Sequence, residues 1–230
     1  MDYDNAPPFE VARYREMQSA LPGVDALYRL MLAQLEIEMK TGGHVLVVGA
    51  GGGREVEALC NSKLTFHVTG VDPSKDMLKI TQWYAGQSAR AENTQLLEGT
   101  TADVAAPCGG FDAATSILVM HFLKDEEGEQ GKRAYLQAIR ERLKPGGLFV
   151  HADISFDSNG DFERLKPVFL RHAMLVGLAE EDVKAGPGMI ASLPIISRTE
   201  TETLLAESGF RDAQLFFQTL WYRAWIARAE

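Results

Sequence analysis

The segment VLVVGAGGGRE at residues 45–55 constrains the fold more than any other part of the sequence. Its apolar run, ended by glycine, is typical of a central parallel strand that is buried on both faces. Gly49, Gly51 and Gly53 then leave the backbone N–H groups of a strand-to-helix turn accessible to a ligand. The segment therefore predicts an α/β chain that binds a nucleotide-bearing ligand at the end of its first strand.

Asp72 strengthens this interpretation because it follows directly on the next expected strand, residues 64–71. A carboxylate roughly 20 residues after such a loop can accept hydrogen bonds from both ribose hydroxyls. The dinucleotide fingerprint G-x-G-x-x-G would need glycine at position 54, where the sequence has Arg54. NAD is therefore disfavoured, since the missing glycine is the one that allows close helix packing at a pyrophosphate.

Strands and helices alternate through most of the remaining chain. Further strands are expected in short apolar or alternating runs, at residues 95–98, 111–119, 148–154, 213–217 and 222–227. Helices are expected at residues 74–84 and 130–143, and from a Thr199–Glu202 capping box up to Gly209. Residues 1–42 are expected to form a helical cap, and residues 156–198 a helical insertion with one helix near 162–176. We therefore predict one domain, 1–230, built on a doubly wound, seven-stranded, mostly parallel sheet.

Composition excludes several classes of protein. The net charge of -9 and the pI near 5.1 oppose binding to nucleic acid or anionic lipid, which needs clustered Lys and Arg. Cys60 and Cys108 have neither metal-binding nor disulfide-scaffold spacing, and no zinc-protease, hydrolase or phosphate-loop motif occurs. The acidic N-terminus is unlike a secretory signal, and no run is apolar enough to span a bilayer. We expect a cytoplasmic protein without a metal, a membrane or a nucleic-acid partner.

Five motifs in order resemble the class I methyltransferases that use S-adenosylmethionine (SAM). They are VLVVGAGGG, VTGVDPSKDML, LLEGTTADV, FDAATSILVMHFL and LKPGGLFV, and the resemblance covers most of the chain from residue 45. It implies a Rossmann-like methyltransferase fold, SAM as cofactor, S-adenosylhomocysteine as product and a small-molecule methyl acceptor. It also implies the cofactor contacts, which are Gly49, Ala50, Gly51 and Gly53 for methionine and ribose, Asp72 for the ribose hydroxyls, Pro73 and Met77 for adenine, and Ser116, Ile117 and Leu118 for the other side of the cofactor.

Two positions depart from the family pattern. Val47 stands where the family usually has an acid that helps to position the amino group of SAM. Thr100 and Thr101 follow Gly99, where an acid commonly contacts the adenine amine, and Asp103 is the nearest carboxylate. We expect a threonine hydroxyl or the backbone to contact adenine instead. These departures leave open a protein that binds SAM without transferring a methyl group.

A more specific similarity concerns the carboxy-SAM synthases of tRNA wobble modification. The segment ALPGVDAL and the tail from residue 188 to 217 are similar to that subfamily. Its members use an arginine in the insertion to bind the extra carboxylate, and Gly186 occupies the matching position here. Carboxy-SAM synthesis is therefore the weaker alternative.

Methyl transfer from a sulfonium is an in-line displacement with an already activated electrophile, so alignment and exclusion of water are the main requirements. His121, at the end of the fourth strand, is the candidate base for an acceptor that must lose a proton, with a structural role as the alternative. Arg13, Tyr14, Met174 and Met189 are candidates for a lid over the pocket. The acceptor atom (O, N, S or C) and the oligomeric state stay open, a homodimer being one option.

Overall fold

Seven strands form one sheet in the computed structural model, which describes residues 4–5, 10–124 and 131–230. The strands are β1 (Gly43–Val48), β2 (Phe66–Asp72), β3 (Thr94–Glu98), β4 (Phe111–Ile117), β5 (Leu143–Ile154), β6 (Phe210–Thr219) and β7 (Tyr222–Ala229). They lie in the order β3-β2-β1-β4-β5-β7-β6, and β7 runs antiparallel to both of its neighbours. The other neighbouring pairs are parallel, which confirms the predicted doubly wound, mostly parallel sheet.

Strand β1 marks the point where the strand order reverses. It pairs with β2 on one side and with β4 on the other. In doubly wound sheets, ligands bind in the crevice outside the carboxyl ends of the strands at such a point. The turn at residues 49–53 and the chain that follows β4 therefore meet at the edge of the sheet where a ligand is expected.

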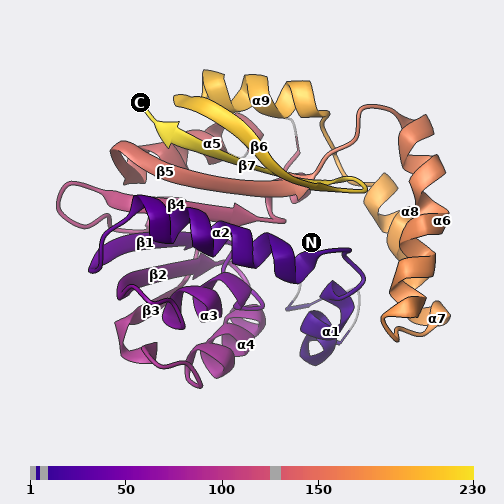
Figure 1. Cartoon of the computed structure of the whole chain (residues 1–230), viewed down its shortest axis with the longest axis horizontal. Coiled ribbons are helices and arrows are strands. Elements are labelled where there is room, and N and C mark those ends of the chain that lie inside the picture. Colours follow the sequence, from indigo (N-terminus) through magenta and orange to yellow (C-terminus); the bar gives the residue numbers. More distant parts are fainter. Residues whose placement is uncertain (1–3, 6–9, 125–130) are drawn as a thin grey trace.

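Helices cover both faces of the sheet (Figure 1). On one face Val45 and Val47 pack in a core with helices α2 (Val24–Glu38), α3 (Arg54–Cys60) and α4 (Lys75–Ala85). On the other face Leu46 and Val48 pack with α5 (Lys132–Arg142) and α9 (Arg198–Glu207). Because successive strand residues point to opposite faces, the continuous apolar run of β1 is what a strand between two helical layers requires.

Local side chains set the helix ends, with one correction to the sequence prediction. Ser74 caps α4, since its hydroxyl accepts a backbone N–H of the first turn. Helix α9 is capped by Ser197, which forms reciprocal bonds with Glu200, so the predicted capping box of Thr199 and Glu202 is wrong. The same S/T-x-x-E pattern occurs two residues earlier, where Ser197 has the extended backbone that a cap needs.

The insertion and the described part of the N-terminal segment that precedes α2 lie beyond one end of the strands (Figure 1). The insertion forms α6 (Asn159–Leu175), α7 (Glu180–Val183) and α8 (Gly186–Ala191), which is more helix than the single one predicted. In the N-terminal segment a short α1 (Tyr14–Gln18) precedes α2, and Arg13 bonds Asp182 of α7 at 2.8 Å. No helix in the described part of the chain is long and apolar enough to cross a membrane.

Candidate active site

The turn after β1 has a backbone geometry that glycine adopts readily. Gly49, Gly52 and Gly53 have positive φ angles of 73°, 79° and 69°. The N–H groups of Gly49 and Ala50 donate to the carbonyl oxygen of Val71 at 2.9 and 3.0 Å. These bonds attach the turn to the end of β2. This turn, residues 49–53, is called the glycine loop below, and it lies where β1 and β2 both end.

Asp72 lies directly against this glycine loop. Its Oδ2 accepts the N–H of Gly51 at 2.9 Å, and its Oδ1 accepts the N–H of Ser74 at 2.8 Å. A Cβ added to Gly51 would come within 2.9 Å of both Asp72 Oδ2 and the Cβ of Met77. Burial raises the pKa of Asp72, and the two backbone N–H donors oppose that rise. The structure thus brings Gly51, Asp72 and Met77 together, with the exposed Pro73 beside them.

The N-terminal segment covers the glycine loop. Tyr14 packs so closely on Gly52 that a Cβ there would come within 2.2 Å of the Tyr14 ring. Arg15 donates from Nε to the carbonyl oxygen of Gly52 at 2.7 Å. Asp4 accepts two backbone N–H groups at the start of α4. The sequence suggested Tyr14 as a lid residue, but no local pattern signals the contacts of Arg15 and Asp4 with segments so far along the chain.

The other expected cofactor contacts differ in accessibility. Leu118 has a φ of 61° and lines a pocket, whereas Ile117 is almost fully buried. Ser116 is buried, with its hydroxyl in a hydrogen bond to a tyrosine hydroxyl. Thr100 bonds within its own turn through both its N–H and its hydroxyl, and Thr101 is buried. Of this set, Leu118 is the residue whose side chain reaches the pocket.

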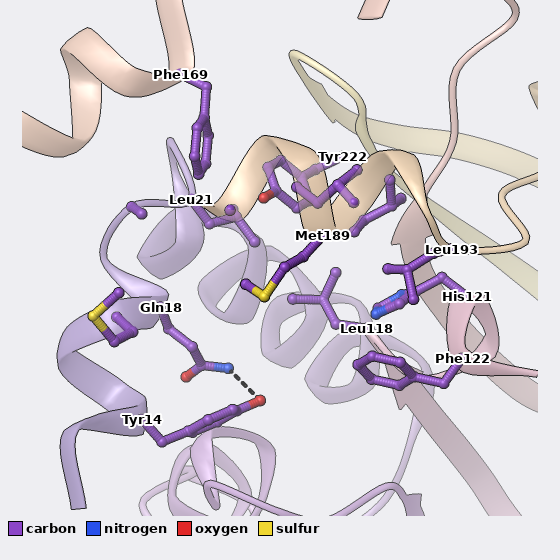
Figure 2. Close-up of a pocket in the computed structure, with 15 residues that line it drawn as sticks. Tyr14, Gln18, Leu21, Leu118, His121, Phe122, Phe169, Met189, Leu193 and Tyr222 are labelled. Carbon is purple, nitrogen blue, oxygen red and sulfur yellow. Dashed lines mark hydrogen bonds between the residues drawn. The ribbon is translucent and has the colours of Figure 1, made fainter. Parts of the chain in front are cut away.

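A pocket of about 190 Å³ lies between the N-terminal segment, the end of β4 and the insertion (Figure 2). At one end Gln18 donates a hydrogen bond to the Tyr14 hydroxyl at 3.1 Å, and His121 lies at the opposite end. Leu118 and Met189 project into the space between them (Figure 2). The pocket therefore has apolar walls and polar ends, and it adjoins the glycine loop because Tyr14 contacts both.

His121 is held by a buried carboxylate. It lies on the 3-10 turn Met120–Phe122 that follows β4, and its Nδ1 is hydrogen-bonded to Asp153 of β5. His121 is 5% exposed and Asp153 is 3% exposed. The Asp153 oxygen that binds the ring also accepts the N–H of Ile154 at 2.8 Å, which fixes its position.

This contact determines which ring nitrogen of His121 accepts a proton. A carboxylate acceptor at Nδ1 holds the proton on that nitrogen, so Nε2 carries the lone pair. Within residues 4–5, 10–124 and 131–230, Nε2 has no hydrogen-bond partner. The His121–Asp153 pair is therefore suited to take a proton from a group in the pocket. The sequence identified His121 but not Asp153, because the two are separated by 32 residues.

The first strand lacks the acid that the family usually has at position 47, but a buried acid occurs nearby at Glu55. Val47, where the family usually has an acid, is fully buried in the sheet. Glu55, in the first turn of α3, is also buried, and its Oε1 has no hydrogen-bond partner. Burial raises the pKa of Glu55 to about 8, so its neutral form is favoured at pH 7. No sequence signal distinguished Glu55 from the exposed acids of the chain.

The residues at this edge of the sheet fit SAM. Because Gly51 has no Cβ, its backbone N–H can approach the Asp72 carboxylate closely enough to bond it. A carboxylate at this position suits ribose hydroxyls. Met77, which packs on the same glycine, offers an apolar surface for the adenine ring of SAM. In the described part of the chain, no group of three or more His, Cys, Asp or Glu side chains could hold a metal ion.

Comparisons with known proteins agree with this geometry. Residues 46–149 match the model of a methyltransferase domain family. The chain is 28% identical over 160 residues to a ubiquinone biosynthesis O-methyltransferase of Idiomarina loihiensis, which covers 66% of this chain and 62% of that protein. It is 33% identical over 110 residues to a protein of the same name from Cereibacter sphaeroides, covering 47% and 40%. The chain therefore spans less than two thirds of the length of these relatives.

Solved structures show the same fold. A SAM-dependent methyltransferase from Aquifex aeolicus superposes with a TM-score of 0.63 at 15% identity, over 96% of this chain and 100% of that one. The YcgJ protein of Bacillus subtilis gives a TM-score of 0.59 at 18% identity, over 84% and 71%. Fold and site thus define a Rossmann-like protein of the class I methyltransferase type. Residues 46–149 match a methyltransferase domain, and the residues at the edge of its sheet fit SAM as the cofactor.

Proposed function

We propose that the whole chain transfers the methyl group of SAM to a hydroxyl group of a small-molecule acceptor. The His121–Asp153 pair carries this proposal, because it places a proton-accepting nitrogen in an apolar pocket. That pocket touches the cofactor loop through Tyr14. Oxygen as the acceptor atom is supported by relatives that are named O-methyltransferases.

The proposed cofactor contacts follow the edge of the sheet from β1 to β4. The glycine loop binds methionine and ribose through its backbone, and Asp72 binds the ribose hydroxyls. The adenine would pack on Pro73 and Met77 near Thr100 and Thr101. Leu118 closes the opposite side, supported from within by Ser116 and Ile117.

SAM supplies a methyl group that its sulfonium already activates, so the chain has to align an acceptor oxygen and remove its proton. Nε2 of His121 takes the proton as the new O–CH3 bond forms, and the electrons of the broken C–S bond remain on sulfur. Asp153 then stabilises the imidazolium and keeps the ring in place. The apolar pocket walls exclude water from the reacting groups.

Binding of SAM without methyl transfer is the second candidate, and the absence of an acid at Val47 favours it. The strand offers no carboxylate there for the amino group of SAM. Carboxy-SAM synthesis is not favoured, because Gly186 lines the pocket and supplies no cation for a second carboxylate.

Two measurements test the proposal. The first is calorimetric titration with S-adenosylhomocysteine and SAM, where absence of saturable binding would overturn the cofactor site. The second is turnover by His121→Gln, which should lower kcat by about 10²- to 10⁴-fold and leave the affinity for S-adenosylhomocysteine within about threefold. Phe122→Leu, in the same turn and also in the pocket wall, should change KM more than kcat. Full turnover by His121→Gln would refute its role as base, and binding without turnover of any hydroxyl acceptor would favour the second candidate.

A further inference from the structure

We infer that the acceptor is an uncharged phenol-sized molecule, with one ring, apolar substituents and the reactive hydroxyl directed at His121. This inference rests on the proposed function and specifies the substrate class of the same pocket. The charges, size and layout of the pocket support it.

Among the residues that the structure describes, those lining the pocket include no Lys, Arg, Asp or Glu. Among its 15 lining residues, polar side-chain atoms belong to Tyr14, Gln18, His121 and Tyr222, and the rest are apolar or glycine. Three arginines adjoin pocket residues in the sequence, and each already bonds outside the pocket. Arg13 bonds two carboxylates, Arg15 bonds the Gly52 carbonyl oxygen and Glu57, and Arg223 forms two bonds to Asp157.

A charged acceptor would therefore lose its hydration without gaining a partner of opposite charge. Burial of an unpaired ion is much more costly than burial of an apolar group of the same size. The pocket should discriminate against both anions and cations by at least about tenfold in affinity. An acceptor with a carboxylate or phosphate is thus a poor fit.

The size of the pocket limits the acceptor to about one ring. A dry cavity of roughly 150 Å³ lined by Leu, Ile and Phe binds benzene. The pocket here has a volume of about 190 Å³ and similar walls, including Leu21, Leu193 and Phe169. The additional volume accommodates a few substituent atoms on a single ring.

The layout of the polar groups orients such a ring. His121 is at one end of the pocket and the Tyr14–Gln18 pair at the other, with Leu118 and Met189 between them (Figure 2). A hydroxyl that donates to Nε2 of His121 places the ring against these apolar side chains. A second polar substituent would meet the Tyr14–Gln18 pair.

Three phenols of matched size test the inference, namely 4-ethylphenol (neutral), 4-hydroxyphenylacetate (anion) and tyramine (cation). Their dissociation constants are measured by calorimetry at pH 7, with and without saturating S-adenosylhomocysteine. We expect 4-ethylphenol to bind at least about tenfold more tightly than either charged analogue. Equal or tighter binding of a charged analogue, or no saturable binding of any of the three, would overturn the inference.

A charge placed in the wall provides the matched test. Met189→Arg introduces a cation where Met189 projects into the pocket, and it should improve binding of 4-hydroxyphenylacetate at least about fivefold relative to 4-ethylphenol. Ala191→Arg adds the same charge to an exposed position of α8 outside the pocket, and it should leave the order unchanged. An unchanged order in Met189→Arg would also overturn the inference. Failure of S-adenosylhomocysteine to bind would overturn the proposed function alone, because the phenol order is measured without it as well.

Discussion

Replacement of Glu55 by glutamine measures how much the buried carboxyl group of Glu55 changes the free energy of unfolding. Glu55 is 3% exposed, and its Oε1 has no hydrogen-bond partner. Burial raises the pKa of its carboxyl, the nearby charges of Arg15 and Arg54 lower it, and that of Asp72 raises it further. Burial dominates, and the resulting pKa is about 8, against 4.5 for an exposed glutamate.

The sign of the pH dependence follows from the difference in protons bound. Between pH 4.5 and about 8 the unfolded chain has lost the proton of Glu55 and the folded chain retains it. The folded state therefore binds more protons, and the free energy of unfolding falls as pH rises through this range. Each pH unit corresponds to about 1.4 kcal/mol, so at pH 7 the protein is destabilised by up to about 3 kcal/mol relative to pH 4.5.

Glutamine has nearly the shape of the neutral acid and does not titrate. The variant Glu55→Gln should therefore match the native chain near pH 5 and exceed it by about 2 to 3 kcal/mol at pH 7. The assay is urea unfolding at pH 5, 6, 7 and 8, with the difference between variant and native chain taken at each pH. Glu181→Gln, which alters an exposed carboxylate, should give a difference near zero throughout. A constant difference for Glu55→Gln across this range would refute the reasoning, because it would show that Glu55 is already ionised in the folded protein.

Three further predictions concern the cofactor, the base and the core. Asp72→Asn should raise the dissociation constant for S-adenosylhomocysteine at least about tenfold by removing a charge-assisted hydrogen-bond acceptor, and an unchanged value by calorimetry would contradict the ribose contact. Asp153→Asn should lower kcat by about 10²-fold or more with a small change in KM, since His121 loses the carboxylate that fixes its tautomer. A native kcat in a steady-state assay of this variant would argue against that role of Asp153. Trp221→Ala should cost about 3 to 5 kcal/mol in urea unfolding, because the fully buried ring packs on Phe169, and a loss below about 1 kcal/mol would show that the core collapses to fill the space.

The sheet was predictable from the sequence because its central strands are chemically distinct from their surroundings. The run VLVV is apolar at four successive positions, and all four side chains are buried, two in each core. The start of β5 was not predictable in the same way. Residues 144–147 (KPGG) are typical of the end of a helix, so the strand was expected to begin at residue 148. In the structure β5 already begins at Leu143. Phe111 pairs with Leu143 and Ala113 with Leu148, so the proline and glycines form an irregularity within the strand.

The cofactor edge of the site was more predictable than the acceptor side. Gly51 and Asp72 meet because a parallel pair of strands brings the ends of β1 and β2 together, and spacing along the chain is enough to infer this. His121 and Asp153 meet only because Ile117 at the end of β4 pairs with Ala152 of β5. Strand register is set by side-chain packing in three dimensions, so an acid on a later strand gave no local sign of its partner.

The position of the acceptor pocket relative to the matched domain indicates where specificity resides. The family match covers residues 46–149, and among the described residues that line the pocket it includes Leu118, His121 and Phe122. The remaining lining comes from the N-terminal segment, the end of β5, the insertion and the start of β7. Under the proposed function, the shared domain supplies the base and the cofactor edge, while segments outside it set the size and charge of the acceptor. Substitutions of the pocket-lining residues of α1 or α8 should accordingly change which acceptor binds without changing the affinity for S-adenosylhomocysteine, except at Tyr14, which packs on the glycine loop and so belongs to both sites.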